Sequence, residues 1–600
     1  ALLTLARDRR YGAEPAVAND QAGAALTQLE LHTWMTQQRT VVVGVHVDKS
    51  RCQGSATGVY LGCCRVRDRS NGGDAVTDDG DVGLDRSRAG SVEHGCITND
   101  EISHGRTVRH PRSRARLAKK LLGRENGAMS SIAGQTWDIV VIGAGAAGAV
   151  IATRASEDPH RSVLLLDAGP DYPLGADLPA DLVDGHDNSY VDHDWGLTYN
   201  PLGDRSDRFP RGRVTGGSTA VNTTIALRGI PADYDGWAEL GNPAWAWDQV
   251  LPAFNRLERD LDYGDEPYHG DAGPISIRRW TEDELVPTQA AFIEAALQHG
   301  FPASDDVNAP DAVGVGPMAM NKLGRLRIST AIGYLASARY RANLTIRPDT
   351  LVNRVVVEHG RAVGVETDAG DRIGARLVVV SAGAVHTPGV LIRSGIGSAD
   401  ELASLGVEPV ATMDGVGANL SDHPALAIVM SPKFPEFCTP DLPLVQTICR
   451  YTTERSNTPL DVNIELITRT SSRSGDPMFM LAPSLEQVDG RGAVRQTSLA
   501  PHSMPSIQAH FGENERDLAR HVQALEDAFA LTRLAPLREF IDQVHFPDPS
   551  RISRADLEQV ARRVSASGYH PCGTAKMGPA DDPLAVVDQF GRCHGVDQLV

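Results

Sequence analysis

The pattern of apolar and polar positions changes character along the chain. Residues 1–128 show little apolar periodicity. From residue 137 to about 172, an apolar run, a glycine-rich turn and a second apolar run follow one another, which predicts a strand, a helix and a parallel strand. Residues 344–380 alternate in a strand-like way and predict a meander that ends in a buried strand. This order favours an α/β fold that begins with a parallel sheet.

Beyond residue 424 the pattern is different. Residues 443–450, 460–467 and 505–511 are typical of strands in an antiparallel sheet. Residues 515–534 predict an amphipathic helix, because their apolar positions recur at helical spacing. We therefore expect an α+β domain, built on an antiparallel sheet, to follow the α/β part.

The first glycine-rich turn, residues 143–148, carries the strongest candidate chemistry. Gly143 permits a tight turn, Gly145 lets the backbone approach a pyrophosphate, and Gly148 lets the following helix pack closely on the strand. The second apolar run ends in Asp167, 24 residues after Gly143, where a carboxylate can accept hydrogen bonds from a ribose hydroxyl. The turn therefore predicts an unphosphorylated adenosine dinucleotide and leaves open which one.

Composition narrows the class of protein. The 600 residues are 41% hydrophobic and 22% charged, as in an ordinary globular protein of two or more domains. The net charge of −19 argues against a nucleic-acid partner. No apolar stretch approaches the roughly 18 residues of a membrane span. Eight cysteines make no disulfide framework, so we expect a cytoplasmic protein and leave peripheral membrane association open.

Residues 1–128 differ in composition from the rest of the chain. They carry 19 Lys and Arg against 15 Asp and Glu, although the whole chain is strongly acidic. Cys52, Cys63, Cys64 and His46 match no metal-ligand spacing, so no metal site is expected. We expect this stretch to be an atypical extension, non-functional or disordered, and the functional protein to begin near Met129.

Four segments in this order resemble the glucose–methanol–choline (GMC) family of FAD-dependent oxidoreductases. They are residues 143–148, 212–222, 383–397 and 569–578, and the resemblance covers residues 137–600. It implies a Rossmann-like FAD-binding domain of the GMC type, which we place at 136–430, followed by the substrate domain at 431–600. The family continues past the position of Val600 with a further strand and a second catalytic histidine or asparagine, so we expect the C-terminal domain to be truncated.

The resemblance also implies which residues bind the cofactor. Some family members tether FAD through a histidine at the position of Val221, so we expect FAD to be bound here without a covalent link. Asp167 would serve the adenosine ribose, and residues 213–222 would follow the pyrophosphate and the flavin. The residues assigned to the cofactor are Gly143, Ala144, Gly145, Ala146, Ala147, Gly148, Asp167, Arg213, Gly216, Gly217, Ser218, Asn222 and Val352.

One histidine is assigned to catalysis. His570 lies in the last of the four segments, and its ordinary pKa near neutrality suits a general base that takes a proton from an alcohol. In the family this histidine faces the flavin N5, which receives hydride from the substrate carbon. We interpret His386 as structural. His423 and His594 do not stand in the motif of the missing second residue and are left unassigned.

The function that the resemblance implies is a dehydrogenase acting on the CH–OH group of an alcohol and passing electrons to a quinone or other carrier. An oxidase using dioxygen, an inactive truncated flavin-fold remnant and a hydroxynitrile lyase are the alternatives. Aromatic residues make up only 5% of the chain, which weakly favours a neutral alcohol over choline.

Overall fold

A computed structural model describes residues 44–47, 64–67, 132–173, 178–471 and 474–600. Strand β1 (Gly44–Val47) pairs antiparallel with β2 (Cys64–Arg67). The other predictions for residues 1–128, including the expectation that Cys52 and Cys63 form no metal site, concern residues outside the described ranges. Residues 134–600 belong to one compact unit, and the following account concerns that unit.

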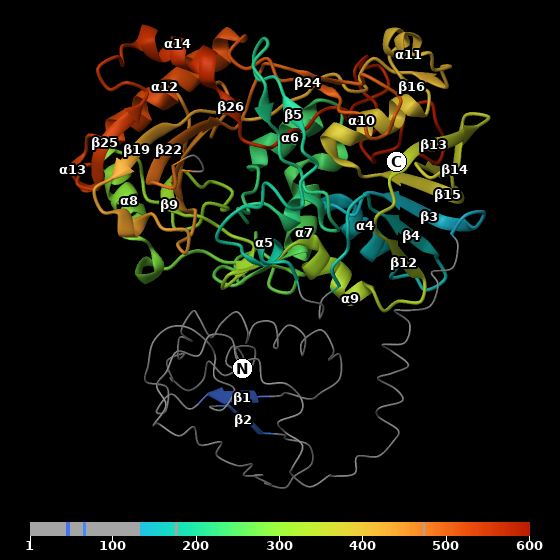
Figure 1. The fold of residues 1–600 in the computed structure, drawn as a ribbon, viewed down its shortest axis with the longest axis horizontal. Coiled ribbons are helices and arrows are strands. Elements are labelled where there is room, and N and C mark those ends of the chain that lie inside the picture. The colour runs from blue at the N-terminus through green and yellow to red at the C-terminus, as the bar shows by residue number, and fades with distance from the viewer. Residues whose placement is uncertain (1–43, 48–63, 68–131, 174–177, 472–473) are drawn as a thin grey trace. The chain divides into compact units, whose positions relative to one another are not determined.

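The first sheet of this unit combines four parallel strands with an antiparallel meander. Its six strands lie in the order β12-β4-β3-β15-β14-β13, and α4 (Ala146–Ala155) connects β3 with β4 (Figure 1). Of the meander predicted over residues 344–380, only β13, β14 and β15 form one, because β12 pairs in parallel with β4 at the opposite edge of the sheet. The strands are β3 (Thr136–Ile142), β4 (Val163–Leu166), β12 (Leu344–Arg347), β13 (Val352–Glu358), β14 (Arg361–Thr367) and β15 (Arg372–Val380).

The apolar runs explain why β3 and β4 lie inside this sheet rather than at its edges. Val140 and Val141 of β3 point to opposite faces, and both are fully buried. Leu164 and Leu165 of β4 are buried in the same way. A parallel strand that is covered on both faces needs such a continuous apolar run, as the sequence predicted.

The second sheet is antiparallel throughout. It has eight strands, ordered β25-β19-β22-β21-β20-β9, with β18 and β26 paired at the side. Strands β9, β18 and part of β19 precede residue 431, so this sheet is assembled from both predicted domains. The strands are β9 (Gly314–Pro317), β18 (Pro424–Ala425), β19 (Ile428–Pro432), β20 (Val445–Tyr451), β21 (Val462–Thr470), β22 (Pro477–Leu485), β25 (Ile541–Phe546) and β26 (Ala566–Ser567).

The two faces of the second sheet have different characters. On one face, Val462, Ile464 and Leu466 of β21 are fully buried in a core shared with α8 (Pro287–His299) and α12 (Glu515–Leu531). The alternate residues of the same strand, among them Asn463 and Glu465, belong to the other face. One face therefore anchors the helices, while the other carries polar groups away from that core.

Two sequence predictions differ from the structure in detail. The helix predicted at 515–534 is α12, which ends at Leu531. The strand predicted at 505–511 is only β24 (Ser506–Gln508), and it pairs with β23 (Ala493–Arg495) outside the large sheet. A strand pattern in the sequence specifies which side chains are buried, whereas its partner is chosen by contacts distant along the chain.

The end of the chain returns to the first sheet. The Val600 amide donates to the carbonyl of Val378 at 2.9 Å, and the Val380 amide donates to the carbonyl of Val600 at 2.7 Å. The last four residues, 597–600, therefore lie against the first sheet, whereas the sequence prediction placed them in the substrate domain.

The remaining elements are short. The further helices are α5 (Ala180–Val183), α6 (Pro231–Glu239), α7 (Trp247–Leu257), α9 (Ala336–Ala338), α10 (Gly383–Arg393), α11 (Ala399–Leu405), α13 (Ala535–Arg538) and α14 (Arg554–Val564). Small two-stranded sheets join β5 (Thr198–Tyr199) to β6 (Asp207–Arg208), β7 (Glu258–Asp260) to β8 (Ile275–Ile277), β10 (Lys322–Leu323) to β11 (Leu326–Arg327), and β16 (Ile396–Gly397) to β17 (Ala411–Thr412). Within the described ranges, none of the helices has both the length and the apolar character that a membrane crossing requires.

Candidate active site

The two glycine-rich segments predicted to hold the cofactor pack directly on each other. The Gly216 amide donates to the carbonyl of Ala144 at 2.8 Å. Gly216 and Gly217 both have positive φ, at 100° and 53°. A Cβ on Gly217 would lie 2.7 Å from the Cα of Gly145, closer than two carbon atoms can approach. Segments about 70 residues apart in the sequence thus form one glycine-lined surface.

The N-terminus of α4 opens at this surface. Ala146 and Ala147 in its first turn are exposed, and no acidic side chain lies there. No side chain caps the helix at Gly145. Free amide groups and the positive end of the helix dipole favour an anion at this position.

A third segment fixes the turn from the side of β15. The Ser381 hydroxyl lies 2.8 Å from the carbonyl of Ile142 and 2.9 Å from that of Gly143, and donates to both. A Cβ on Gly143 would lie 2.6 Å from the carbonyl oxygen of Ser381. Gly148 is equally constrained, since its Cβ would lie 1.9 Å from the Gly143 carbonyl oxygen. The glycines at both ends of the turn are therefore required by close backbone approach.

Asp167 lies at the end of β4 and braces the same turn. One carboxylate oxygen accepts the Ala144 amide at 2.7 Å, and the other accepts the Gly169 amide at 2.8 Å. Burial raises the pKa of Asp167 although these two bonds act in the opposite direction. The ribose contact stays a prediction, and the structure adds that this carboxylate holds the glycine turn in place.

The other predicted cofactor residues lie around this centre. Arg213 donates to the carbonyl of Ala168 at 3.2 Å. Val352 is buried at the start of β13, two residues after Thr350, whose amide donates to the Asp167 carbonyl. Ser218 is exposed, and the side-chain oxygen of Asn222 accepts the Thr224 amide at 3.1 Å. These residues surround the carboxyl ends of β3 and β4, where open α/β sheets bind ligands.

This arrangement fits the adenosine and pyrophosphate of FAD. The glycine surface has no side chain between the backbone and a bound group, and the amides of α4 face it. Val221 is buried and offers no nucleophile for a covalent bond to a flavin.

Asp422 joins the two segments that carry His570 and His423. A single oxygen of its buried carboxylate accepts the His423 amide at 2.8 Å and the His570 amide at 2.9 Å. Its other oxygen accepts the hydroxyl of Ser567. Residues almost 150 positions apart are in this way held side by side.

His570 and His423 touch through their rings. Their Nδ1 atoms are 3.3 Å apart, so one of the two nitrogens donates and the other accepts. The Nδ1 of His423 also lies 3.2 Å from a carboxylate oxygen of Glu486. The imidazole of His570 is otherwise exposed.

The neighbours shift the pKa values of the two rings in opposite directions. Burial alone would lower the pKa of His423, but the charge and hydrogen bond of Glu486 raise it to about 9. Desolvation lowers the pKa of His570, and the adjacent His423 lowers it further. At neutral pH, His423 is therefore the cation and His570 is a neutral imidazole.

A second glutamate completes the cluster. Burial, and then the charge of Glu486, raise the pKa of Glu465 to about 8, so this carboxyl is mostly protonated at neutral pH. Burial acts to raise the pKa of Glu486 as well, but His423 outweighs it and the pKa falls. At neutral pH the site thus holds one cation and one anion, His423 and Glu486, beside a neutral imidazole and a mostly protonated glutamate.

The sequence analysis missed the partners of His570. His423 stands in the run Asp422-His-Pro424, and the sequence left it unassigned because it does not match the motif of the second catalytic residue. Glu465 occupies a polar position in an otherwise strongly apolar strand, and that irregularity is the only local indication of a functional residue. The proximity of His423 and Glu465 to His570 depends on tertiary contacts, so the spacing of these residues along the sequence does not show it.

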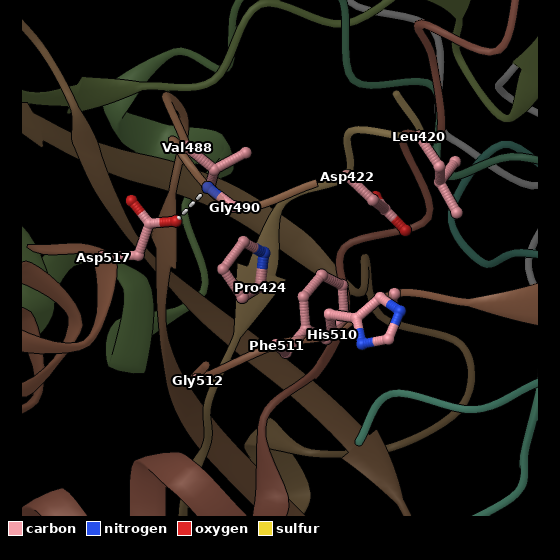
Figure 2. Close-up of a pocket in the computed structure, with 10 residues that line it drawn as sticks. Leu420, Asp422, Pro424, Val488, Gly490, His510, Phe511, Gly512 and Asp517 are labelled. Carbon is pink, nitrogen blue, oxygen red and sulfur yellow. Dashed lines mark hydrogen bonds between the residues drawn. The ribbon is translucent and has the colours of Figure 1, made fainter. Parts of the chain in front are cut away.

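A small pocket adjoins the buried side of Asp422 (Figure 2). Figure 2 shows Asp517 turned toward Gly490, whose amide it accepts at 2.7 Å. The pocket measures about 20 Å³, which is room for about one water molecule. It is too small for a substrate and belongs to the support of Asp422. It is lined by Leu420, Asp422, Pro424, Val488, Gly490, Ala509, His510, Phe511, Gly512 and Asp517.

His386 and His594 lie in other environments. The ring of His386 packs on Trp195 at a centroid distance of 4.1 Å, and burial lowers its pKa to about 4. The Nε2 of His594 is 3.1 Å from the carbonyl oxygen of Gly578. Neither histidine is in contact with His570, and the structural interpretation of His386 stays a prediction.

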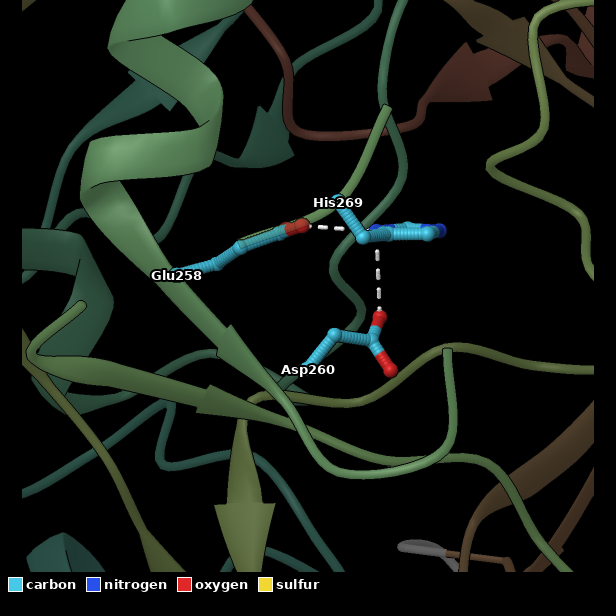
Figure 3. A group of neighbouring side chains, drawn as sticks. All are labelled: Glu258, Asp260 and His269. Atoms are coloured by element: carbon cyan, nitrogen blue, oxygen red, sulfur yellow. Dashed lines mark hydrogen bonds and ion pairs between the residues drawn. The ribbon is translucent and has the colours of Figure 1, made fainter. Parts of the chain in front are cut away.

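His269 forms a second polar cluster with three acids. Its Nδ1 is 2.6 Å from Glu258 and 3.2 Å from Asp260, and Figure 3 shows both carboxylates turned toward the ring. Its Nε2 is 2.8 Å from Asp306. Hydrogen bonds to Asp306 and Glu258 overcome the effect of burial and raise the pKa of His269.

Two arginines complete this second cluster. Arg279 pairs with Asp260 at 2.5 Å and with Asp306 at 2.6 Å, and Arg228 pairs with Glu258. Glu258, Asp260 and His269 are spaced like metal ligands, with donor atoms within 4.8 Å of one another. Because guanidinium groups already neutralise the carboxylates, we interpret the group as a buried ion network.

Comparison with known proteins agrees with this geometry. The profile of the N-terminal GMC oxidoreductase domain matches residues 137–425, and that of the C-terminal domain matches residues 489–600. Oxygen-dependent choline dehydrogenase 1 of Chromohalobacter salexigens is 34% identical over 77% of this chain and 89% of its own length. The 5-(hydroxymethyl)furfural oxidase of Methylovorus sp. is 33% identical over 77% of this chain and 92% of its own.

Solved structures show the same fold. The crystal structure of pyridoxine 4-oxidase from Mesorbium loti matches with a TM-score of 0.71 and 28% identity, over 77% of this chain and 93% of that one. A formate oxidase matches with a TM-score of 0.69 at 21% identity, which supports the fold alone.

The glycine turn, the helix N-terminus and the mixed sheet define a dinucleotide-binding flavoprotein whose cofactor is FAD. The chain belongs to the GMC oxidoreductase family, as the four sequence segments predicted.

Proposed function

We propose that the protein oxidises the CH–OH group of a small alcohol and passes the electrons to a quinone or another carrier. The observation that carries this proposal is the neutral, exposed imidazole of His570 beside a cationic His423. FAD, when bound, supplies the hydride acceptor at its N5 position.

His570 acts as the general base that takes the hydroxyl proton of the substrate. A base must be unprotonated before the reaction, and the neighbouring positive charge of His423 keeps it so. The same charge makes the protonated His570 a stronger acid, which favours release of the proton afterwards. Asp422 acts as a positioning residue, because it fixes the backbone of both histidines.

The cofactor would be held by the glycine surface described above. The amides of the first turn of α4 would face the pyrophosphate, and Asp167 with the start of β13 would lie at the adenosine. Because Val221 stands at the position of the tethering histidine, we propose a dissociable flavin. Acid precipitation should therefore release FAD from the protein, and flavin that stays with the polypeptide would contradict this part.

The polar face near His570 also bears on the substrate. Glu465 and Glu486 place two acidic groups close to the base. Because Glu465 is mostly protonated and the charge of Glu486 is balanced by His423, the cluster is compatible with a neutral or a cationic alcohol and does not select the substrate by charge. Two of the relatives are named for choline and for 5-(hydroxymethyl)furfural, so a cationic and a neutral alcohol both belong in a test.

The proposal is tested by flavin bleaching under anaerobic conditions. We expect neutral primary alcohols or choline to reduce the FAD-loaded protein. Failure of every alcohol, with FAD bound and the protein folded, would refute the proposal and leave the lyase or the inactive remnant. Reoxidation by a quinone but not by air supports the dehydrogenase, whereas rapid peroxide formation in air identifies an oxidase.

A further inference from the structure

A groove beside the end of α4 gathers four arginines, of which only Arg154 has an acidic partner within the described part of the chain. It measures about 430 Å³ and lies between the ends of α4 and α7, the start of β7, and the turn that contains Tyr334. Its lining includes the guanidinium groups of Arg154, Arg256, Arg259 and Arg341, but the carboxylates of only Glu157 and Asp271. This excess of positive charge occurs in a chain whose net charge is −19.

The ion pairs of the groove leave most of this charge uncompensated. Arg154 pairs with Glu157 at 2.8 Å. Arg341 donates to the carbonyl of Thr153 and, at 2.8 Å, to the hydroxyl of Ser156, so it caps the end of α4 without meeting a carboxylate. The described residues provide no ion pair for Arg256 or Arg259.

Arg259 is the most informative of the four. Its guanidinium is half-buried and donates to the Ser276 hydroxyl at 2.9 Å, while its Nε has no hydrogen-bond partner among the described residues. Desolvation lowers its pKa, and no carboxylate opposes that effect. A guanidinium that is partly removed from water without a counter-ion destabilises the fold, and a bound anion would relieve this.

Two residues that carry hydroxyl groups, Thr153 and Tyr334, also line the groove. The side-chain oxygen of Thr153 is buried and without a partner in the described structure. The hydroxyl of Tyr334 lies within the electrostatic reach of Arg154 and Arg256, and its ring packs 5.5 Å from the Arg154 guanidinium. Planar guanidinium groups together with hydroxyls are the donor set that recognises phosphate and carboxylate oxygens.

We propose that this groove is a binding site for a small polyanion, either a phosphorylated compound or a polycarboxylate. Arg256 and Arg259 make the principal contacts, and Thr153 and Tyr334 donate through their hydroxyls. The volume exceeds that of a single water, about 30 Å³ in the liquid, by an order of magnitude, so a ligand larger than one inorganic ion fits. The site is independent of the proposed oxidation at His570.

The test is calorimetric titration of the FAD-loaded protein at physiological ionic strength with pyrophosphate and, separately, with citrate. We expect saturable binding of at least one, which also identifies the anion class. The double variant R256A/R259Q should weaken the affinity at least tenfold. R551A, which removes an arginine with a 70% exposed side chain elsewhere, should leave it unchanged.

Two outcomes would overturn the proposal. One is the absence of saturable binding by either probe, and the other is equal affinity in the wild type and in R256A/R259Q. Should the double variant fold poorly, R256A alone gives the same reading, because Arg256 is exposed and makes no ion pair in the described structure. FAD content and the rate of flavin reduction should be unchanged in R256A, which separates this site from the proposed active site.

Discussion

His570 and His269 are both set among charged groups, yet their surroundings are opposite. His269 has carboxylates at both ring nitrogens, a raised pKa and no exposed surface on its side chain. His570 has another histidine at one nitrogen, a lowered pKa and an exposed ring. The surroundings favour the cationic form of His269 and the neutral form of His570.

This difference separates a structural role from a chemical one. In the His269 cluster, three carboxylates face two guanidiniums, so the protonated imidazole supplies the last positive charge. Loss of the proton from His269 would therefore destabilise the folded structure. In the His570 pair, a charge of the same sign lies next to the ring, so a proton gained there is readily lost again. Burial of a histidine is therefore less informative than the sign of the charge beside it.

The largest effect is expected for H570A. Removal of the proposed base should lower the rate of flavin reduction by about 10²- to 10⁴-fold, the usual contribution of general-base catalysis. Stopped-flow measurement with the best alcohol of the panel gives this rate. FAD content should match the wild type, because His570 lies outside the glycine surface.

The matched control is H160A, which removes an exposed histidine from the loop before β4. Its rate should equal that of the wild type. A reduction rate in H570A within threefold of the wild type would remove His570 from the mechanism.

The fold and the site were predictable from the sequence to different degrees. The glycine turn and β3 could be predicted because their constraints are local. Close backbone approach requires Gly143 and Gly148, and burial on both faces requires the apolar run. The catalytic role of His570 could be predicted only from a family motif. Its partner His423 was not, because a histidine before a proline has no local feature that places it 3.3 Å from another histidine.

The second prediction concerns the stability of the His269 cluster. In H269Q the remaining carboxylates keep one uncompensated negative charge in a buried site, and we expect the free energy of unfolding to fall by about 3–5 kcal/mol. Chemical denaturation of the FAD-loaded protein measures this. The control H160Q should have the stability of the wild type, and an equally stable H269Q would show that the network contributes little.

The pH dependence of the stability difference between the wild type and H269Q tests whether His269 carries a positive charge. The pKa of His269 is raised in the folded state, so its stabilising contribution is complete below the unfolded pKa of about 6.5. The contribution is lost as the pH rises through the raised folded pKa. The stability gap between the wild type and H269Q should therefore narrow at alkaline pH, and a gap that widens there would contradict a cationic His269.

A smaller effect is expected from E486Q, which removes the carboxylate that keeps His423 charged. The pKa of His423 should fall from about 9 toward its ordinary value of 6.5. His423 then becomes neutral near pH 7, the pKa of His570 rises, and the acid limb of kcat/KM moves to higher pH. Each unit of that movement lowers the rate on the limb about tenfold.

The control for E486Q is E513Q, because Glu513 faces the exposed His510 at 3.1 Å. Its pH profile should coincide with that of the wild type. A purely structural role for Glu486 would lower kcat at all pH values alike, so a profile that is scaled but not shifted would contradict the electrostatic role.

The smallest effect is expected for a histidine–aspartate ion pair on the surface. The Nε2 of His502 lies 2.7 Å from Asp368, a shorter contact than most of those at His269, but the two side chains are 59% and 39% exposed. Water screens both partners, so D368N should change the free energy of unfolding by no more than about 1 kcal/mol. Denaturation of D368N beside H269Q, at low and at high salt, measures the contrast. A loss in D368N comparable with that in H269Q would mean that distance, rather than burial and net charge, determines what a histidine–carboxylate contact contributes.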